Sequence, residues 1–79
     1  MPRVTVLYFA ALRERRGRAS EEIDVPPGTR VSQLYADLFP VGPEGRLPVA
    51  FARNGHYADA DEEIAEGDEV ALLPPLGGG

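Results

Sequence analysis

Apolar residues alternate with a two-residue period at the start of this chain. Residues 3–9 (RVTVLYF) are rich in β-branched and aromatic side chains and predict a strand. The alternation places Val4, Val6 and Tyr8 on one face of this strand and Thr5, Leu7 and Phe9 on the other. We therefore expect one face to join a core, while the other is unusually apolar.

A helical period follows in two places. Residues 10–16 are good helix formers, and Gly17 stands where a left-handed cap would end a short helix. In residues 31–39, before Pro40, the apolar residues recur at helical spacing: Val31, Leu34, Tyr35, Leu38 and Phe39. This main amphipathic helix has one apolar stripe, which suits it to cover one face of a small sheet.

Two hairpins are predicted from turn signals. Residues 21–25 alternate polar and apolar side chains and end at Pro26-Pro27-Gly28, which indicates a second strand paired with the first. Residues 48–53 predict a third strand, which runs into Asn54-Gly55, the strongest short hairpin signal in the sequence. Residues 56–58 then form a brief return strand.

The order of these elements predicts the fold class. Residues 41–47 read as a loop, and residues 69–73 are the last strand. The order is typical of an α+β fold of the β-grasp (ubiquitin-like) type, with one main helix on one face of a mixed sheet. Its first and last strands lie parallel at the centre. We predict a β-grasp domain over residues 1–73 and a flexible, extended C-terminal tail over residues 74–79.

Composition excludes several functions for these 79 residues. The sequence has no cysteine and one histidine, His56, so we expect neither thiol chemistry nor a metal site. The net charge of −5 argues against nucleic-acid binding, because no basic stripe exists to replace phosphate counterions. No apolar run approaches the roughly 20 residues of a membrane span. With no signal-peptide pattern either, we expect a cytoplasmic protein without a membrane partner.

The C-terminal residues Pro74-Pro75-Leu76-Gly77-Gly78-Gly79 suggest where chemistry takes place. Proline lacks an amide hydrogen, so the chain must leave the sheet at Pro74. Six extended residues can carry the Gly79 carboxylate about 20 Å beyond the last strand. Glycines present bare backbone, which a narrow channel in a partner can enclose. The alternative is a frayed terminus, as at many chain ends.

Several segments together resemble the MoaD branch of the MoaD/ThiS family of ubiquitin-like sulfur carriers. The resemblance covers the whole chain and is carried by Val6 to Glu14, Asn54, Gly67 to Ala71, and Pro74 to Gly79. The double proline before the glycines is the most specific of these features. The chain departs from the family at Tyr57, where an aliphatic residue is common, and at Gly77, where alanine, serine or threonine is usual.

The resemblance implies a function as the sulfur carrier of molybdopterin synthase. A MoeB-like enzyme would use ATP to adenylate Gly79, and a sulfur donor would convert the adenylate to a thiocarboxylate. A MoaE-like large subunit, expected to form a heterotetramer with this chain, would then pass the sulfur to the cyclic pyranopterin precursor. The chain itself would be a non-catalytic subunit with no bound cofactor.

The resemblance also implies which residues the partners bind. Pro74, Pro75, Leu76, Gly77 and Gly78 would be recognised as the tail. The apolar residues Phe9, Tyr57 and Leu73 would contact both the activating enzyme and the large subunit, and Arg13 would also contact the partner. Two of these, Phe9 and Leu73, fall on the strand face that does not join the core. The competing interpretations are that residues 41–47 cover this face, and that Arg13 is an ordinary solvated helix residue.

The sequence is also compatible with other functions. A similar tail could carry sulfur for thiamine, for a modified tRNA base or for a tungsten cofactor. A ubiquitin-like modifier would join Gly79 to lysines of other proteins, whereas this chain has no lysine of its own. The third possibility is an interaction module with an inert tail.

Overall fold

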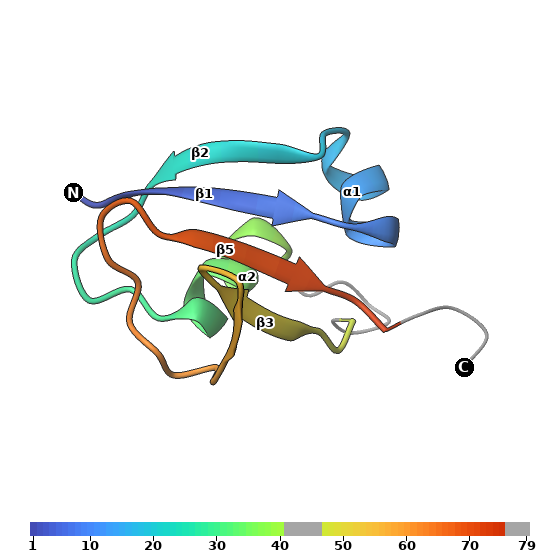
Figure 1. The fold of residues 1–79 in the computed structure, drawn as a ribbon. Helices are drawn as coiled ribbons and strands as arrows, with labels where there is room; N and C mark the ends of the chain where they lie inside the picture. The colour runs from blue at the N-terminus through green and yellow to red at the C-terminus, as the bar shows by residue number, and fades with distance from the viewer. Residues whose placement is uncertain (41–46, 76–79) are drawn as a thin grey trace.

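A computed structural model describes residues 1–40 and 47–75 and confirms the β-grasp prediction (Figure 1). The elements in chain order are β1 (Arg3–Tyr8), α1 (Ala10–Arg16), β2 (Ser20–Asp24), α2 (Val31–Leu38), β3 (Ala50–Arg53), β4 (His56–Ala58) and β5 (Glu69–Leu73). The strands form one mixed sheet in the order β2-β1-β5-β3-β4. First and last strands are parallel neighbours at the centre, and the other pairs are antiparallel.

The element boundaries lie within two residues of those predicted, and local chemistry accounts for two of the differences. Phe9 leaves β1 because it is the N-cap of α1, with its backbone still extended. The third strand begins at Ala50, opposite Leu73 at the end of β5, because Pro74 and Pro75 beyond Leu73 have no amide hydrogen for the ladder. At Gly17, φ is 74°, which confirms the left-handed cap of α1.

The core lies between α2 and one face of the sheet. As the alternation predicted, Val4, Val6 and Tyr8 of β1 are at most 1% exposed. They join buried residues from β5, from both helices and from the connecting segments: Leu12, Val25, Val31, Leu34, Tyr35, Phe39, Ile64, Val70 and Leu72. None of the helices in residues 1–40 and 47–75 is long and apolar enough to cross a membrane.

The two adjacent leucines of β5 test this division of the sheet into two faces. Leu72 is fully buried between β1 and β3, whereas Leu73 is half-buried on the opposite face. Leu72→Ala is expected to lower the free energy of unfolding by about 2–5 kcal/mol, because it leaves a cavity in the core. Leu73→Ala should cost less than half as much in the same urea titration. Equal losses from both variants would contradict the assignment of the faces.

Asp68 ties the start of β5 to its neighbours, which the sequence alone did not predict. It is 7% exposed. Its Oδ2 accepts hydrogen bonds from Arg53 Nε at 2.7 Å and from the Ala65 amide at 2.8 Å, and its Oδ1 accepts one from Asn54 Nδ2 at 2.9 Å. Burial raises the pKa of this carboxyl, but the three hydrogen bonds together outweigh burial and hold the pKa below its ordinary value.

Replacing Asp68 should therefore change the acid stability of the fold. Because the folded-state pKa is lowered, the stabilisation by Asp68 is present above pH 3.8 and is lost as the pH falls through the folded-state pKa. Asp68→Ala is expected to cost about 2–4 kcal/mol at neutral pH and to flatten the acid limb of a plot of stability against pH. The exposed Asp24, paired with Arg3, is the matched control and should have a much smaller effect. Acid limbs of the same steepness in wild type and Asp68→Ala would contradict this role.

Candidate functional site

The strand register collects apolar side chains on the sheet face away from α2. Across the sheet, Leu7 of β1 pairs with Ala71 of β5, Ala71 pairs with Ala52 of β3, and Ala52 pairs with Tyr57 of β4. One step closer to the tail, Ala50 pairs with Leu73, and Phe9 follows the end of β1. We call this surface the outer face and define it by its apolar members: Leu7, Phe9, Ala50, Ala52, Tyr57, Ala71 and Leu73.

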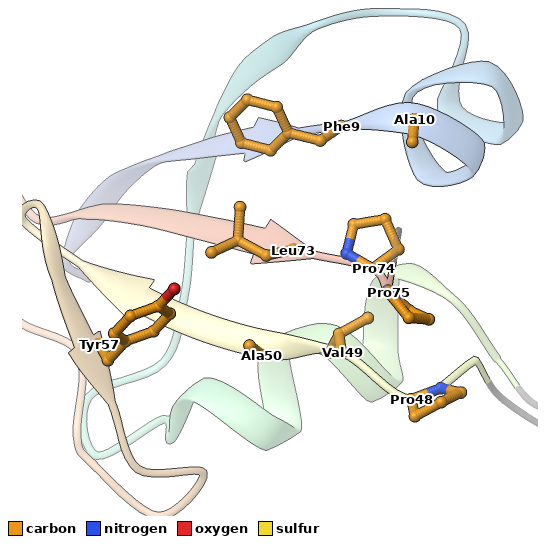
Figure 2. A pocket seen from close by; sticks show the side chains of 9 residues that line it. All are labelled: Phe9, Ala10, Pro48, Val49, Ala50, Tyr57, Leu73, Pro74 and Pro75. Atoms are coloured by element: carbon orange, nitrogen blue, oxygen red, sulfur yellow. The ribbon is translucent and has the colours of Figure 1, made fainter. Parts of the chain in front are cut away.

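A hollow lies in the outer face where the chain leaves the sheet (Figure 2). Its volume is about 590 Å³. Phe9 follows the end of β1, Leu73 ends β5 and Tyr57 lies in the middle of β4, and all three line the hollow. The rest of the lining has smaller side chains: Ala10, Pro48, Val49, Ala50, Pro74 and Pro75. Because alanine is small, the large side chains stand around a depression into which a partner's side chain could insert.

Exposure distinguishes the outer face from the rest of the described surface. Phe9 is 43% exposed and Tyr57 is 83% exposed, and both are on this face. Within the described parts of the chain, Met1 is the one other large hydrophobic residue so exposed. Clustered exposed apolar side chains are typical of a protein-binding site. The structure thus brings together three of the predicted partner residues, although their role in binding stays a prediction.

The loop that could have covered the outer face is only partly described. Leu47 packs against the core, and its carbonyl accepts a hydrogen bond from the Tyr35 hydroxyl of α2 at 2.5 Å. It therefore lies with the helix rather than over Phe9. Residues 41–46 lie outside the described residues.

The tail leaves the sheet beside the outer face. Since β1 and β5 run parallel, their C-terminal ends lie side by side at the same end of the sheet. There Phe9 and Ala10 line the hollow together with Pro74 and Pro75. The strand ends at Leu73, which confirms that the two prolines leave the ladder. The remaining predicted tail residues, Leu76, Gly77, Gly78 and Gly79, lie outside the described residues, and the proposed division at residue 73 stays a prediction.

Hydrogen bonds and ion pairs around Glu21 hold helix α1 at the end of the sheet where the tail leaves, and the sequence did not predict them. Tyr8 donates a hydrogen bond to Glu21 Oε1 at 2.6 Å, Arg16 donates to the same oxygen, and Arg18 pairs with Oε2 at 3.1 Å. Burial and this hydrogen bond raise the pKa of Tyr8, so the hydroxyl stays protonated. Hydrogen bonds from Tyr8 and Arg16 lower the pKa of Glu21 despite its burial. The network holds α1, and therefore Ala10, beside the tail.

Arg13 is not part of the hollow. It is exposed on α1 and lines a separate depression with Glu14, Gly17 and Arg18. The structure therefore does not bring it together with Phe9, Tyr57 and Leu73, and its predicted contact with partners stays a prediction. Conversely, sequence reasoning missed Pro48, Val49 and Ala50, whose only signal was their place at the start of a predicted strand.

Comparison with known proteins identifies the family. The ThiS family model matches residues 6–79. The molybdopterin synthase sulfur carrier subunit of Mycobacterium tuberculosis is 37% identical over 83 residues, covering 100% of both chains. The human subunit of the same name is 34% identical, over 96% of this chain and 93% of its own. Among solved structures, the small archaeal modifier protein 1 of H. volcanii is 29% identical with a TM-score of 0.80, over 96% of this chain and 100% of that chain. By sequence and fold together, the chain belongs to the ThiS family, the MoaD/ThiS group that its sequence motifs resemble.

Proposed function

We propose that this chain is the sulfur carrier of a molybdopterin synthase, acting as its small subunit. The observation that carries the proposal is the position of the hollow, which lies on the outer face where Pro74 and Pro75 leave the sheet. A partner that docks on the outer face would therefore receive the tail directly. The curated relatives, at 34% and 37% identity over nearly their whole lengths, favour this pathway over thiamine, tRNA or tungsten chemistry.

The proposed chemistry takes place on the Gly79 carboxylate. A MoeB-like enzyme transfers AMP from ATP to this carboxylate, with release of pyrophosphate, which makes the carbonyl carbon an acyl electrophile. Hydrosulfide supplied by a sulfur donor attacks that carbon, the bond to AMP breaks with AMP as the leaving group, and a thiocarboxylate remains once the proton is lost. Because the chain has no cysteine, no thiol of its own competes for the acyl group. The chain is then a carrier rather than an enzyme, binds no cofactor, and acts in the cytoplasm.

The proposed partners share the outer face. A MoaE-like large subunit, with its own active site, would bury Phe9, Tyr57 and Leu73 and form a heterotetramer with this chain. The two prolines have fixed φ angles and would direct the tail into that active site at little entropic cost. Leu76, Gly77 and Gly78 would lie in the narrow channel. Arg13 would form a peripheral contact, since it stands apart from the hollow.

A reconstituted assay tests the proposal. We expect the thiocarboxylated chain, mixed with a MoaE-like subunit and the cyclic pyranopterin precursor, to yield the dithiolene of molybdopterin. The control is the small subunit of a curated relative in the same assay. Product from the relative but none from this chain, although it carries the thiocarboxylate, would overturn the proposal.

A second candidate function is conjugation to other proteins, which the likeness to a small archaeal modifier protein favours. The same activated Gly79 would then form an isopeptide bond with a lysine of a target. Since this chain has no lysine, it cannot form side-chain-linked polymers of itself. Higher-mass bands that contain this chain and vanish without Gly79 would support conjugation. Their absence in cells that make the thiocarboxylate would exclude it.

A further inference from the structure

We propose that Asn54-Gly55 is a latent deamidation site, which hydrogen bonds to Asp68 and Glu69 keep unreactive in the folded chain. Asparagine followed by glycine is the pair most prone to this reaction, since glycine offers no side chain to hinder attack by its amide nitrogen. Asn54 is the only asparagine in the sequence, and both residues are exposed at the turn between β3 and β4. The inference does not depend on the sulfur-carrier function.

The reaction needs a particular movement of the Asn54 side chain. The Gly55 nitrogen attacks Asn54 Cγ, the Cγ–Nδ2 bond breaks, and ammonia leaves with the former Gly55 amide proton. Water then opens the resulting succinimide at either carbonyl, which gives aspartate or isoaspartate. The Asn54 side chain must therefore first rotate so that Cγ comes within reach of the Gly55 nitrogen.

In the folded chain, both polar atoms of the Asn54 side chain are already held. Nδ2 donates to Asp68 Oδ1 at 2.9 Å, and Oδ1 accepts a hydrogen bond from the Glu69 amide at 2.9 Å. The backbone amide of Asn54 also donates to the Glu69 carbonyl at 2.8 Å. Rotation toward Gly55 would break the first two bonds and leave the Asp68 carboxylate without one of its donors. Such losses slow cyclisation by roughly tenfold or more, since hydrogen bonds to charged groups are among the stronger ones.

The product would damage the sheet beside the outer face. An aspartate at position 54 places a second carboxylate against Asp68, where a donor had been. An isoaspartate adds a backbone carbon to a two-residue turn whose φ angles are 53° and 84°. The strand that follows, β4, is at the sheet edge and pairs with β3 alone. Because β4 carries Tyr57, modification at the turn would loosen a member of the outer face.

The first test compares the same chain folded and in urea at one pH and temperature. Mass spectrometry follows the one-dalton gain in the peptide that contains Asn54, and an isoaspartate assay identifies the product. We expect the unfolded chain to react at least about tenfold faster. Equal rates in the two states, or a faster folded state, would overturn the proposal.

The second test removes one of the two hydrogen bonds that hold the Asn54 side chain, the one to Asp68, without unfolding the chain. Asp68→Ala should deamidate several-fold faster than wild type under native conditions, whereas Asp24→Ala, which removes an exposed carboxylate elsewhere, should match wild type. A folded Asp68→Ala variant with the wild-type rate would contradict the protection of Asn54 by Asp68. If that variant does not fold, the comparison of native and urea-treated wild type decides.

Discussion

Removal of Gly79 is expected to abolish sulfur loading by the activating enzyme. Deletion shortens the tail by one residue, about 3.3 Å of extended chain, and leaves the Gly78 carboxylate short of the reacting phosphate. Misplacement by about 1 Å can already cost a factor of 100, so we expect at least that loss in the rate of thiocarboxylate formation. The rate is measured by intact mass spectrometry over time with ATP, a MoeB-like enzyme and sulfide.

Gly77→Ala is the matched control for this deletion. It adds one methyl group two residues from the end and keeps both the tail length and the terminal carboxylate. Since one methyl group is a small change that leaves the reacting carboxylate in place, we expect loading near the wild-type rate. Normal loading of the Gly79 deletion would show that the enzyme does not measure tail length, and poor loading of Gly77→Ala would show that it requires a bare backbone at this position.

Loss of Tyr57 or Phe9 is expected to weaken binding of the MoaE-like subunit without unfolding the chain. Both side chains are exposed, so their truncation removes little core contact. Aromatic anchors around a hollow are typical binding hot spots, and we expect Tyr57→Ala and Phe9→Ala each to raise the Kd by about tenfold or more. Titration calorimetry measures the Kd, and urea titration checks that the stability of the fold is retained.

Tyr57→Phe distinguishes the contribution of the aromatic ring to binding from that of the hydroxyl. If the ring packs against the partner, Tyr57→Phe should bind nearly as well as wild type, because only the hydroxyl is lost. Asp37→Ala, on α2 and outside the outer face, should leave the Kd unchanged. Unchanged binding by both Tyr57→Ala and Phe9→Ala would place the partner on another surface of the chain.

Much of the fold could be predicted because its signals are local. The period of residues 3–9 separated Val6 from Phe9 onto opposite faces, and the structure confirms this separation. The Asn54-Gly55 turn fixed the hairpin between β3 and β4, and Gly17 marked the end of α1. These features depend on backbone preferences and side-chain alternation, which a sequence displays directly.

The site was only partly predictable because it depends on distant pairings. The alternation of residues 3–9 showed that Phe9 faces away from the core. Only the register of β3 against β5 shows that Ala50 lies beside Leu73 on the outer face. The hydrogen bonds of Asp68 join the segment just before β5 to Arg53 and Asn54 at the end of β3, and no local pattern indicates this distant pairing. The separation of Arg13 from the hollow likewise follows from the direction of α1 relative to the sheet, which the helical period leaves undetermined.

The most direct test of the central claim is the intact mass of the wild-type chain after incubation with ATP, a MoeB-like enzyme and a sulfide source. The sulfur-carrier function predicts a mass gain equal to one exchange of oxygen for sulfur, located by fragmentation at Gly79. An unchanged mass, with the enzyme active on the small subunit of a relative, would contradict the claim and favour an interaction module with an inert tail.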